Sequence, residues 1–235
     1  MMAGLEISRQ LRRMRREWNR RARENARHYV VTGQHEWTDE EFFQSGQIAM
    51  EEEILNDLPN VCQGRDPKDM RVLEIGCGAG RVTRAFASFF GEVWAVDISG
   101  EMVRQAREAV ADLPSAHVIR NNGKDLSAVA PHWWGRWGFG QRLEFDFAFS
   151  VIVFQHIPNR QIIENYVREV HRMLRPGGLF KFQVQGSALG AEADSWVGES
   201  FTEEQAREMA ERSGFELRHQ YGAGDQYYWL WYFKR

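Results

Sequence analysis

Residues 72–80 read Val-Leu-Glu-Ile-Gly-Cys-Gly-Ala-Gly, a short apolar run that ends in a glycine at every second position. The apolar beginning is typical of a buried strand, and the first glycine ends it. Gly76, Gly78 and Gly80 permit a tight turn and a close approach of the backbone to a ligand, because they carry no side chain. The next residues predict a helix over 81–89, whose free N–H groups would point into the same space. This stretch therefore predicts the strand, turn and helix that begin an α/β fold.

A second buried strand is predicted over residues 92–97, and it ends in the carboxylate of Asp97. An acid about 20 residues past a glycine turn stands where a ribose-binding carboxylate belongs. Glycines and acid together indicate an adenosine-containing cofactor at the ends of a parallel sheet. The alternative is that Asp97 only caps the helix that follows.

The glycine spacing separates two classes of cofactor. A dinucleotide fold has the pattern G-x-G-x-x-G, but here the third glycine comes one residue early and Arg81 occupies its place. An acid, Glu74, precedes the glycines instead. The spacing therefore disfavours a nicotinamide-dependent oxidoreductase.

Helical and strand patterns alternate through the rest of the chain, which predicts a doubly wound parallel sheet. Pro114 and the Arg175-Pro-Gly-Gly178 segment are expected to end helices, and Thr202 with Gln205 forms a capping-box pattern. The predicted helices cover residues 100–113, 160–174 and 202–213; the predicted strands cover 116–121, 144–154, 179–185, 215–221 and 227–233.

Composition fits one α/β domain with an N-terminal extension. The chain has 235 residues, 43% of them apolar, and a net charge of −3, so it has no global attraction to nucleic acid or to an anionic membrane. Cys62 and Cys77 are the only cysteines, and no residues have metal-ligand spacing, so we expect neither a disulfide framework nor a metal. Without a signal-peptide or membrane-spanning pattern, we expect a cytoplasmic protein. We predict an N-terminal helical extension over residues 1–60 and a cofactor-binding core over 61–235.

The motif Glu74-x-Gly76-x-Gly78-x-Gly80 resembles the first motif of the class I S-adenosylmethionine-dependent methyltransferases. Residues 96–99, 145–156 and 173–180 resemble later motifs of the family, in the right order, so the resemblance covers residues 70–235. It implies a mostly parallel seven-stranded sheet of order 3-2-1-4-5-7-6 with an antiparallel last strand. It also implies S-adenosylmethionine as the cofactor.

The resemblance assigns expected roles to particular residues. Asp97 should accept both ribose hydroxyls, with Ile98 and Met102 beside the adenine, and Ser150 should lie near the methionine part of the cofactor. An adenine contact is expected from the turn after the third strand, where Lys124 interrupts the family's usual Gly-Asp pair and leaves the contacting residue open. The full set of expected cofactor-binding residues is Glu74, Gly76, Cys77, Gly78, Gly80, Arg81, Asp97, Ile98, Met102, Asn122, Gly123, Lys124, Asp125 and Ser150.

Gln155 and His156 follow the fourth strand, at the sheet edge where ligands bind in such folds. The reference pKa of histidine suits a base at neutral pH, so His156 is the candidate base for removing a proton from the methyl acceptor. The alternative is a structural role at the start of the next helix.

The N-terminus is strongly basic. Residues 1–30 contain nine arginines and three glutamates, a charge of +6, and their apolar residues recur at helical spacing. The resulting amphipathic helix is expected to be solvated or internally paired; an anionic small substrate and nucleic acid are the alternatives. The resemblance adds that N-terminal helices form a lid over the acceptor, with ordinary core packing as the alternative. Candidate lid residues are Trp18, Trp37, Phe43, Ser45 and Gly46, with Trp133, Trp134 and Trp137 from a later insertion.

Absent motifs narrow the acceptor. The fourth strand is not followed by the Asn/Asp-Pro-Pro-Tyr motif of enzymes that methylate adenine bases or glutamine amides, and no Pro-Cys nucleophile is present. We therefore predict methyl transfer to an oxygen, nitrogen or sulfur atom of a small molecule. The alternatives are a catalytically silent cofactor-binding protein and a nucleic-acid methyltransferase that uses the basic helix.

Overall fold

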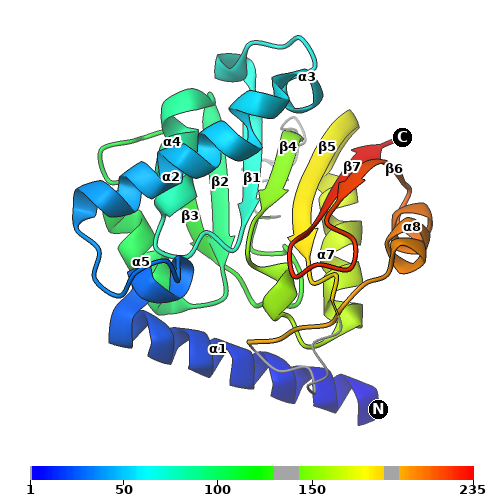
Figure 1. Cartoon of the computed structure of the whole chain (residues 1–235), viewed down its shortest axis with the longest axis horizontal. Helices are drawn as coiled ribbons and strands as arrows, with labels where there is room; N and C mark the ends of the chain where they lie inside the picture. The colour runs from blue at the N-terminus through cyan, green and yellow to red at the C-terminus, as the bar shows by residue number, and fades with distance from the viewer. Residues whose placement is uncertain (1, 130–142, 188–195) are drawn as a thin grey trace, which may run out of the picture. The chain divides into compact units, whose positions relative to one another are not determined.

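The structure, a computed structural model, describes residues 2–129, 143–187 and 196–235 (Figure 1). Its first helices and turns are α1 (Met2–Val30), α2 (Asp39–Glu53), the 3₁₀ turn η1 (Leu55–Asp57), α3 (Leu58–Val61) and the 3₁₀ turn η2 (Pro67–Asp69). Next come β1 (Arg71–Ile75), α4 (Arg81–Phe89), β2 (Glu92–Asp97), α5 (Gly100–Ala109), β3 (Ala116–Arg120), β4 (Phe145–Ser150) and the 3₁₀ turn η3 (Phe154–His156). The last elements are α7 (Arg160–Met173), β5 (Leu174–Val184), α8 (Glu203–Arg212), β6 (Phe215–Tyr221) and β7 (Tyr228–Lys234).

The strands form a seven-stranded sheet of order β3-β2-β1-β4-β5-β7-β6. β1 pairs with β2, β2 with β3, and β4 with β5 in parallel, whereas β7 is antiparallel to both β5 and β6. The predicted α/β fold class and strand order are confirmed. None of the described helices has an apolar stretch long enough to cross a lipid bilayer.

The chain divides into two compact units. Residues 15–120 form one unit, which contains β1 to β3, and residues 1–14 with 121–235 form the other, which contains β4 to β7.

In the unit of residues 15–120, capping side chains begin two of the helices. Thr38 and Glu41 form a capping box that begins α2, and Ser99 caps the N-terminus of α5. α2 runs along α4 (Figure 1). Buried residues from β2, β3, α5 and the glycine turn make one apolar cluster: Cys77, Ala95, Val103, Ala106, Val110 and Val118.

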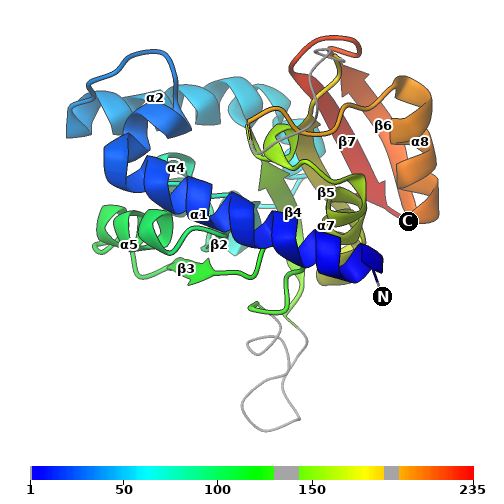
Figure 2. The ribbon, with the colours of Figure 1, turned by 90° about the horizontal axis from the view of Figure 1, so that it is seen from below.

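In the other unit, β7 lies between β5 and β6, and α8 packs beside β6 (Figure 2). β7 is an interior strand, because it pairs with a neighbour on each edge. Its Tyr228, Leu230 and Tyr232 side chains are completely buried, which explains its aromatic sequence. The Thr202 capping box begins α8, as predicted.

Three predicted boundaries are wrong. The strand predicted over 144–154 ends at Ser150, because Ile152 takes a left-handed φ of 56° and the next residues form η3. The strand expected at 179 already begins at Leu174, which pairs with Phe145 before an irregularity in the register. α5 ends at Ala109, whose carbonyl accepts a hydrogen bond from the Arg84 guanidinium.

Candidate functional site

The glycine turn joins β1 to α4. Gly76, Gly78 and Gly80 all have left-handed φ values, of 78°, 53° and 88°. Residues other than glycine seldom adopt this backbone conformation, so each of the three positions requires glycine, as the sequence predicts. Gly80 is the N-cap of α4 and offers no side-chain hydrogen bond, which leaves the first N–H groups of the helix without a side-chain cap.

Protein packing is a second reason for two of these glycines. A Cβ added at Gly78 would lie 2.7 Å from Cγ2 of Val30, and one added at Gly80 would lie 3.0 Å from Cα of Ala106. Cys77, between them, is buried in the apolar cluster, and burial raises the pKa of its thiol well above the usual range. Its surroundings are those of a structural residue.

Asp97 lies at the end of β2 and is bonded to the glycine turn. Its Oδ2 accepts a hydrogen bond from the N–H of Gly78 at 3.0 Å, and its Oδ1 accepts one from the N–H of Ser99 at 2.7 Å. Burial raises the pKa of Asp97 to about 6, although hydrogen bonds from the backbone of Ser99, Gly78 and Ile98 act in the opposite direction. The predicted ribose-binding acid and the glycine turn are thus parts of one hydrogen-bonded arrangement.

Glu74 points into the interior from β1. Burial raises its pKa to about 7, while a 2.6 Å hydrogen bond from Thr83 and the charge of Arg81 lower it. Thr83 was not predicted as part of the site. Its position on α4, one helical turn past the glycines, is the only signal the sequence offers.

Arg81 connects α4 to α2. Its Nη1 donates to the carbonyl oxygen of Ser45 at 2.7 Å, and its Nε is buried without a hydrogen-bond partner among the described residues. A Cβ added at Gly46 would lie 2.2 Å from the Arg81 carbonyl oxygen. Two predicted lid residues, Ser45 and Gly46, therefore contact the first residue after the glycine turn.

The close approach at Gly46 gives a stability prediction. Gly46→Ala would force α2 away from α4, and overpacking of this kind costs about 1–3 kcal/mol. We expect a lower thermal midpoint by calorimetry. Ser45→Ala is the matched control, because Arg81 binds the backbone carbonyl of Ser45 and that group remains. An unchanged midpoint for Gly46→Ala would contradict the close contact.

α1 is also attached to this region. Oδ1 of Asn19 accepts hydrogen bonds from Oγ of Ser99 at 3.0 Å and from the N–H of Glu101 at 3.1 Å, at the start of α5. The Nε2 of Gln105 donates to the carbonyl of Ala22. Asn19 was not predicted; the signal in the sequence is an uncharged amide within an otherwise arginine-rich helix.

The predicted aromatic lid residues pack on the same region. Trp18, Trp37 and Phe43 lie against a buried cluster made of Ala22, Ala26, Phe42, Ala79 and Met102. Met102, the expected adenine neighbour, is therefore in one apolar cluster with the N-terminal helices. Trp133, Trp134 and Trp137 lie outside the described residues.

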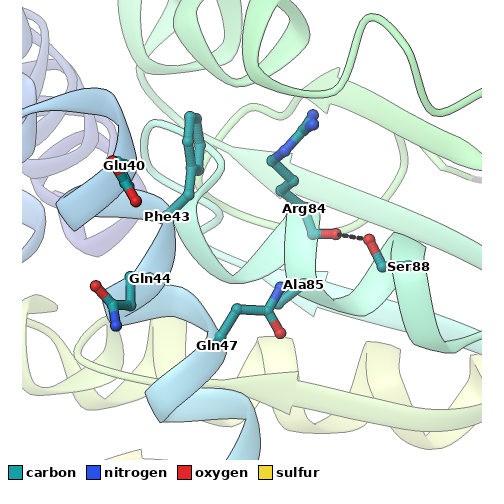
Figure 3. Close-up of a pocket in the computed structure, with 7 residues that line it drawn as sticks. All are labelled: Glu40, Phe43, Gln44, Gln47, Arg84, Ala85 and Ser88. Atoms are coloured by element: carbon teal, nitrogen blue, oxygen red, sulfur yellow. Dashed lines mark hydrogen bonds between the residues drawn. The ribbon is translucent and has the colours of Figure 1, made fainter.

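A hollow of about 370 Å³ lies between α2 and α4 (Figure 3). Phe43 lines one side and Arg84 the other, with the guanidinium 5.5 Å from the ring centroid. Two hydrogen bonds to the carboxylate of Asp112 already hold Arg84. The hollow follows the middle of α4 rather than the glycine turn at its start.

Several N-terminal arginines are paired within the protein. Arg20 pairs with Glu24, and Arg27 with Asp39. Arg12, Arg16 and Arg23 are exposed on α1. The helix is thus partly paired within the protein and partly exposed.

The turn after β3 is closed by its own side chains. Oδ1 of Asn122 accepts from the N–H groups of Lys124 and Asp125, and its Nδ2 donates to Asp125 at 2.8 Å. Partial burial raises the pKa of Asp125, but hydrogen bonds from Ser127 and Asn122 outweigh it and hold the pKa below the usual value. Buried Asn121, which was not predicted, accepts from the N–H of Gly123 and donates to Tyr166.

The turn after β4 carries the candidate base. Gln155 and His156 are both buried in η3, and Nδ1 of His156 lies 2.6 Å from the carbonyl oxygen of Trp196. The Trp196 ring packs against the imidazole at 5.2 Å between centroids. Ser150, at the end of β4, is completely buried.

Gln183 lies on β5, contacts this turn, and was not predicted as part of the site. From β5, its Oε1 accepts a hydrogen bond from the N–H of Ile152 at 2.9 Å. The signal in the sequence is alternation: Lys181, Gln183 and Gln185 alternate with apolar residues along a strand that is otherwise buried. No group of acids, histidines or cysteines in the described part of the chain is arranged to hold a metal ion.

Residues 72–178 match a family model described as "Methyltransferase domain". Among curated proteins, a malonyl-[acyl-carrier protein] O-methyltransferase of Salmonella typhimurium is 31% identical over 157 residues, which are 63% of this chain and 55% of that protein. A ubiquinone biosynthesis O-methyltransferase of Xanthomonas oryzae pv. oryzae is 28% identical over 108 residues, 46% of this chain and 40% of that protein. The chain thus spans about half the length of the curated relatives it matches.

Solved structures share the fold across nearly the whole chain. The DhpI–SAH complex has a TM-score of 0.60 at 16% identity and covers 95% of this chain and 96% of that one. Magnesium protoporphyrin IX methyltransferase from Synechocystis PCC 6803 with bound SAH has a TM-score of 0.60 at 16% identity, covering 89% of this chain and 93% of that one.

Proposed function

We propose that the chain is a class I methyltransferase that transfers a methyl group from S-adenosylmethionine to a small-molecule acceptor; the match of residues 72–178 to a methyltransferase family model and the shared fold support this. The observation that carries this proposal is the bond between the glycine turn and the acid: three glycines with left-handed φ, and Gly78 donating to Asp97. This arrangement supports an adenosine site, and it lacks the third-glycine spacing of a dinucleotide fold.

We assign the cofactor roles residue by residue. Asp97 binds the ribose hydroxyls, Ile98 and Met102 flank the adenine, and Glu74 with Arg81 forms the charged base of the turn. The Asn122–Asp125 turn contributes an adenine contact, and Ser150 lies toward the methionine part. The fit of these residues to S-adenosylmethionine rests on the donor set: a partly buried carboxylate for a diol, and bare backbone for the adenosyl group.

When bound, S-adenosylmethionine supplies an electrophilic methyl group on a sulfonium sulfur. The protein's own contribution is to orient the acceptor, exclude water and accept a proton. We assign the proton to His156, and a water-excluding lid to the N-terminal segment that carries Trp18, Trp37 and Phe43.

The two curated relatives are named O-methyltransferases, which supports oxygen as the acceptor atom. Both cysteines are free and buried, which supports a reducing cytoplasm as the working compartment.

The direct test is turnover of isotopically labelled S-adenosylmethionine with a library of small hydroxyl, amine, thiol and carboxylate compounds. We expect S-adenosylhomocysteine to form together with a labelled product. Cofactor binding without turnover across the library would favour a silent cofactor-binding protein, and tight nicotinamide dinucleotide binding would favour an oxidoreductase.

The raised pKa of Asp97 predicts a pH-dependent affinity. Ribose hydroxyls donate to the ionised carboxylate, so binding is strong above the pKa of about 6 and weakens as the pH falls through it. Calorimetry should show the affinity for S-adenosylhomocysteine falling about tenfold between pH 7 and pH 5. Glu74→Gln removes the other acid that titrates in this range and should keep the dependence. A flat profile in that variant would contradict the assignment of Asp97.

A further inference from the structure

The turn after β4 buries polar atoms that the protein does not satisfy. Gln155 is 3% exposed, His156 6% and Gln183 1%. Oε1 of Gln155 and Nε2 of Gln183 have no hydrogen-bond partner among the described residues. An unpaired buried polar atom is destabilising, so two of them, one in the turn and one on the β5 strand bonded to it, indicate a ligand that pairs them.

The protonation of His156 follows from its neighbour. The Trp196 carbonyl oxygen can only accept, so the Nδ1 that lies 2.6 Å from it must carry a proton. The other nitrogen of the neutral ring, Nε2, then carries a lone pair. Trp196 therefore fixes the tautomer in which Nε2 is the base.

The same reasoning orients Gln155. Its side-chain nitrogen lies 3.4 Å from Nε2 of His156, and the lone pair there accepts from the NH₂ group. The carbonyl end of the Gln155 amide must therefore face away from the imidazole. It is the end left without a partner, and it can only accept.

Gln183 is oriented by the backbone. Its Oε1 accepts from the N–H of Ile152, so its unpartnered atom is the NH₂ nitrogen, which can only donate. Ile152 has φ 56°, a strained conformation for a β-branched side chain. Strained residues of this kind persist where function requires a particular backbone path.

The segment of residues 196–199, here called the strap, is fixed on the turn by backbone contacts. The N–H of Gly198 donates to the carbonyl of Gln155 at 2.7 Å, and that of Glu199 donates to the carbonyl of Ile157. A Cβ added at Gly198 would lie 2.7 Å from both of these carbonyl oxygens. Only glycine allows the strap to approach so closely, and the strap is what carries the Trp196 carbonyl.

We propose that this turn is the methyl-acceptor subsite and that it selects a hydroxyl group; this inference rests on the proposed function. A hydroxyl donates to Oε1 of Gln155 and accepts from Nε2 of Gln183, which pairs both atoms. An ammonium group cannot accept, and a carboxylate cannot donate, so each leaves one buried amide end unpaired. The nitrogen of a neutral aryl amine can donate but accepts only weakly, because its lone pair is delocalised into the ring. The acceptor class is an alcohol or a phenol.

The proton balance of the reaction follows. In the bound state the single acceptor O–H donates to Oε1 of Gln155. As the acceptor oxygen forms the new C–O bond, its O–H turns from Oε1 of Gln155 to Nε2 of His156 and displaces the Gln155 NH₂ group from that lone pair, and the O–H bond breaks with its proton on Nε2. The C–S bond of the sulfonium breaks, and its electron pair remains on sulfur. The products are a methyl ether, S-adenosylhomocysteine and an imidazolium that returns its proton to solvent.

The first test needs no acceptor. Two-bond ¹H–¹⁵N spectra of the ¹⁵N-labelled full chain report which imidazole nitrogen is protonated above neutral pH, and His156→Gln identifies the signal. We expect a protonated Nδ1. A protonated Nε2 would overturn the proposal.

The second test compares phenol, aniline and benzoate as probes, with binding to the S-adenosylhomocysteine-loaded protein measured by saturation-transfer NMR. Phenol should bind best, and Gln155→Met and Gln183→Met should each weaken it about tenfold. Gln161→Leu, at an exposed glutamine on α7, is the control and should change nothing. Thermal melting checks that each variant folds.

The outcomes separate the two proposals. If the wild-type chain binds no S-adenosylhomocysteine, the proposed function fails. If it binds S-adenosylhomocysteine but prefers benzoate or aniline, or does not bind phenol, the hydroxyl subsite is wrong. A loss of S-adenosylhomocysteine affinity in the two methionine variants would also overturn it, because the amides would then serve the cofactor.

Discussion

Asp97→Asn is expected to weaken S-adenosylhomocysteine binding by about two to four orders of magnitude. The carboxylate would receive two ribose hydroxyls, and each hydrogen bond to a charged group contributes about 1.5–3 kcal/mol. Asparagine keeps the size of the side chain and one acceptor for the N–H of Ser99, but its amide nitrogen cannot accept from the N–H of Gly78, so the thermal midpoint is measured beside the affinity. Isothermal calorimetry of the two proteins measures the difference.

A surface acid provides the control. Asp112→Asn removes the ion pair with Arg84. This pair is partly exposed, and Asp112 follows the C-terminal end of α5, whereas Asp97 precedes the N-terminal end. It should lower stability slightly and leave the cofactor affinity unchanged. If Asp97→Asn binds S-adenosylhomocysteine as tightly as the wild type does, Asp97 only caps α5.

His156→Gln is expected to lower kcat by about 10²–10⁴ and to leave S-adenosylhomocysteine affinity unchanged. Glutamine can still donate to the Trp196 carbonyl, but its amide cannot take a proton from the acceptor. Steady-state kinetics with the best acceptor from the library gives the effect. The pH profile should also lose the limb that reports the base.

His35→Gln, in the exposed segment between α1 and α2, is the matched control for this substitution. A kcat close to that of the wild type in His156→Gln would assign His156 the structural role of holding the strap. Thermal midpoints distinguish that case from misfolding.

The sequence predicts the helix and strand that follow the glycine turn residue by residue because glycines delimit them. The predicted helix over 81–89 and strand over 92–97 have the observed bounds, since Gly80 and Gly91 border them. The capping residues Ser99 and Thr202 locate two further helix starts. Glycine borders and capping residues act on the backbone within a few residues of themselves. They can therefore be recognised from one short stretch of sequence.

The contents of the site could be predicted less well, because they depend on contacts between distant segments. The apolar run over 144–154 has the same composition whether Ile152 continues the strand or turns out of it, and a glutamine on another strand accepts its N–H. Asn19 and Ser99 are eighty positions apart and meet only in the folded chain. The imidazole of His156 is likewise held by the backbone carbonyl of Trp196. Every residue has such a carbonyl, so the sequence gives no signal for this contact.

Burying two acids beside the glycine turn makes ligand binding a proton-releasing event. With the pKa of Asp97 near 6 and that of Glu74 near 7, part of the unliganded population holds a proton near neutrality. A ligand that requires the ionised forms must expel that proton into the buffer. The heat of titration should consequently differ between phosphate and Tris, whose ionisation enthalpies are unequal, and the difference counts the protons that leave.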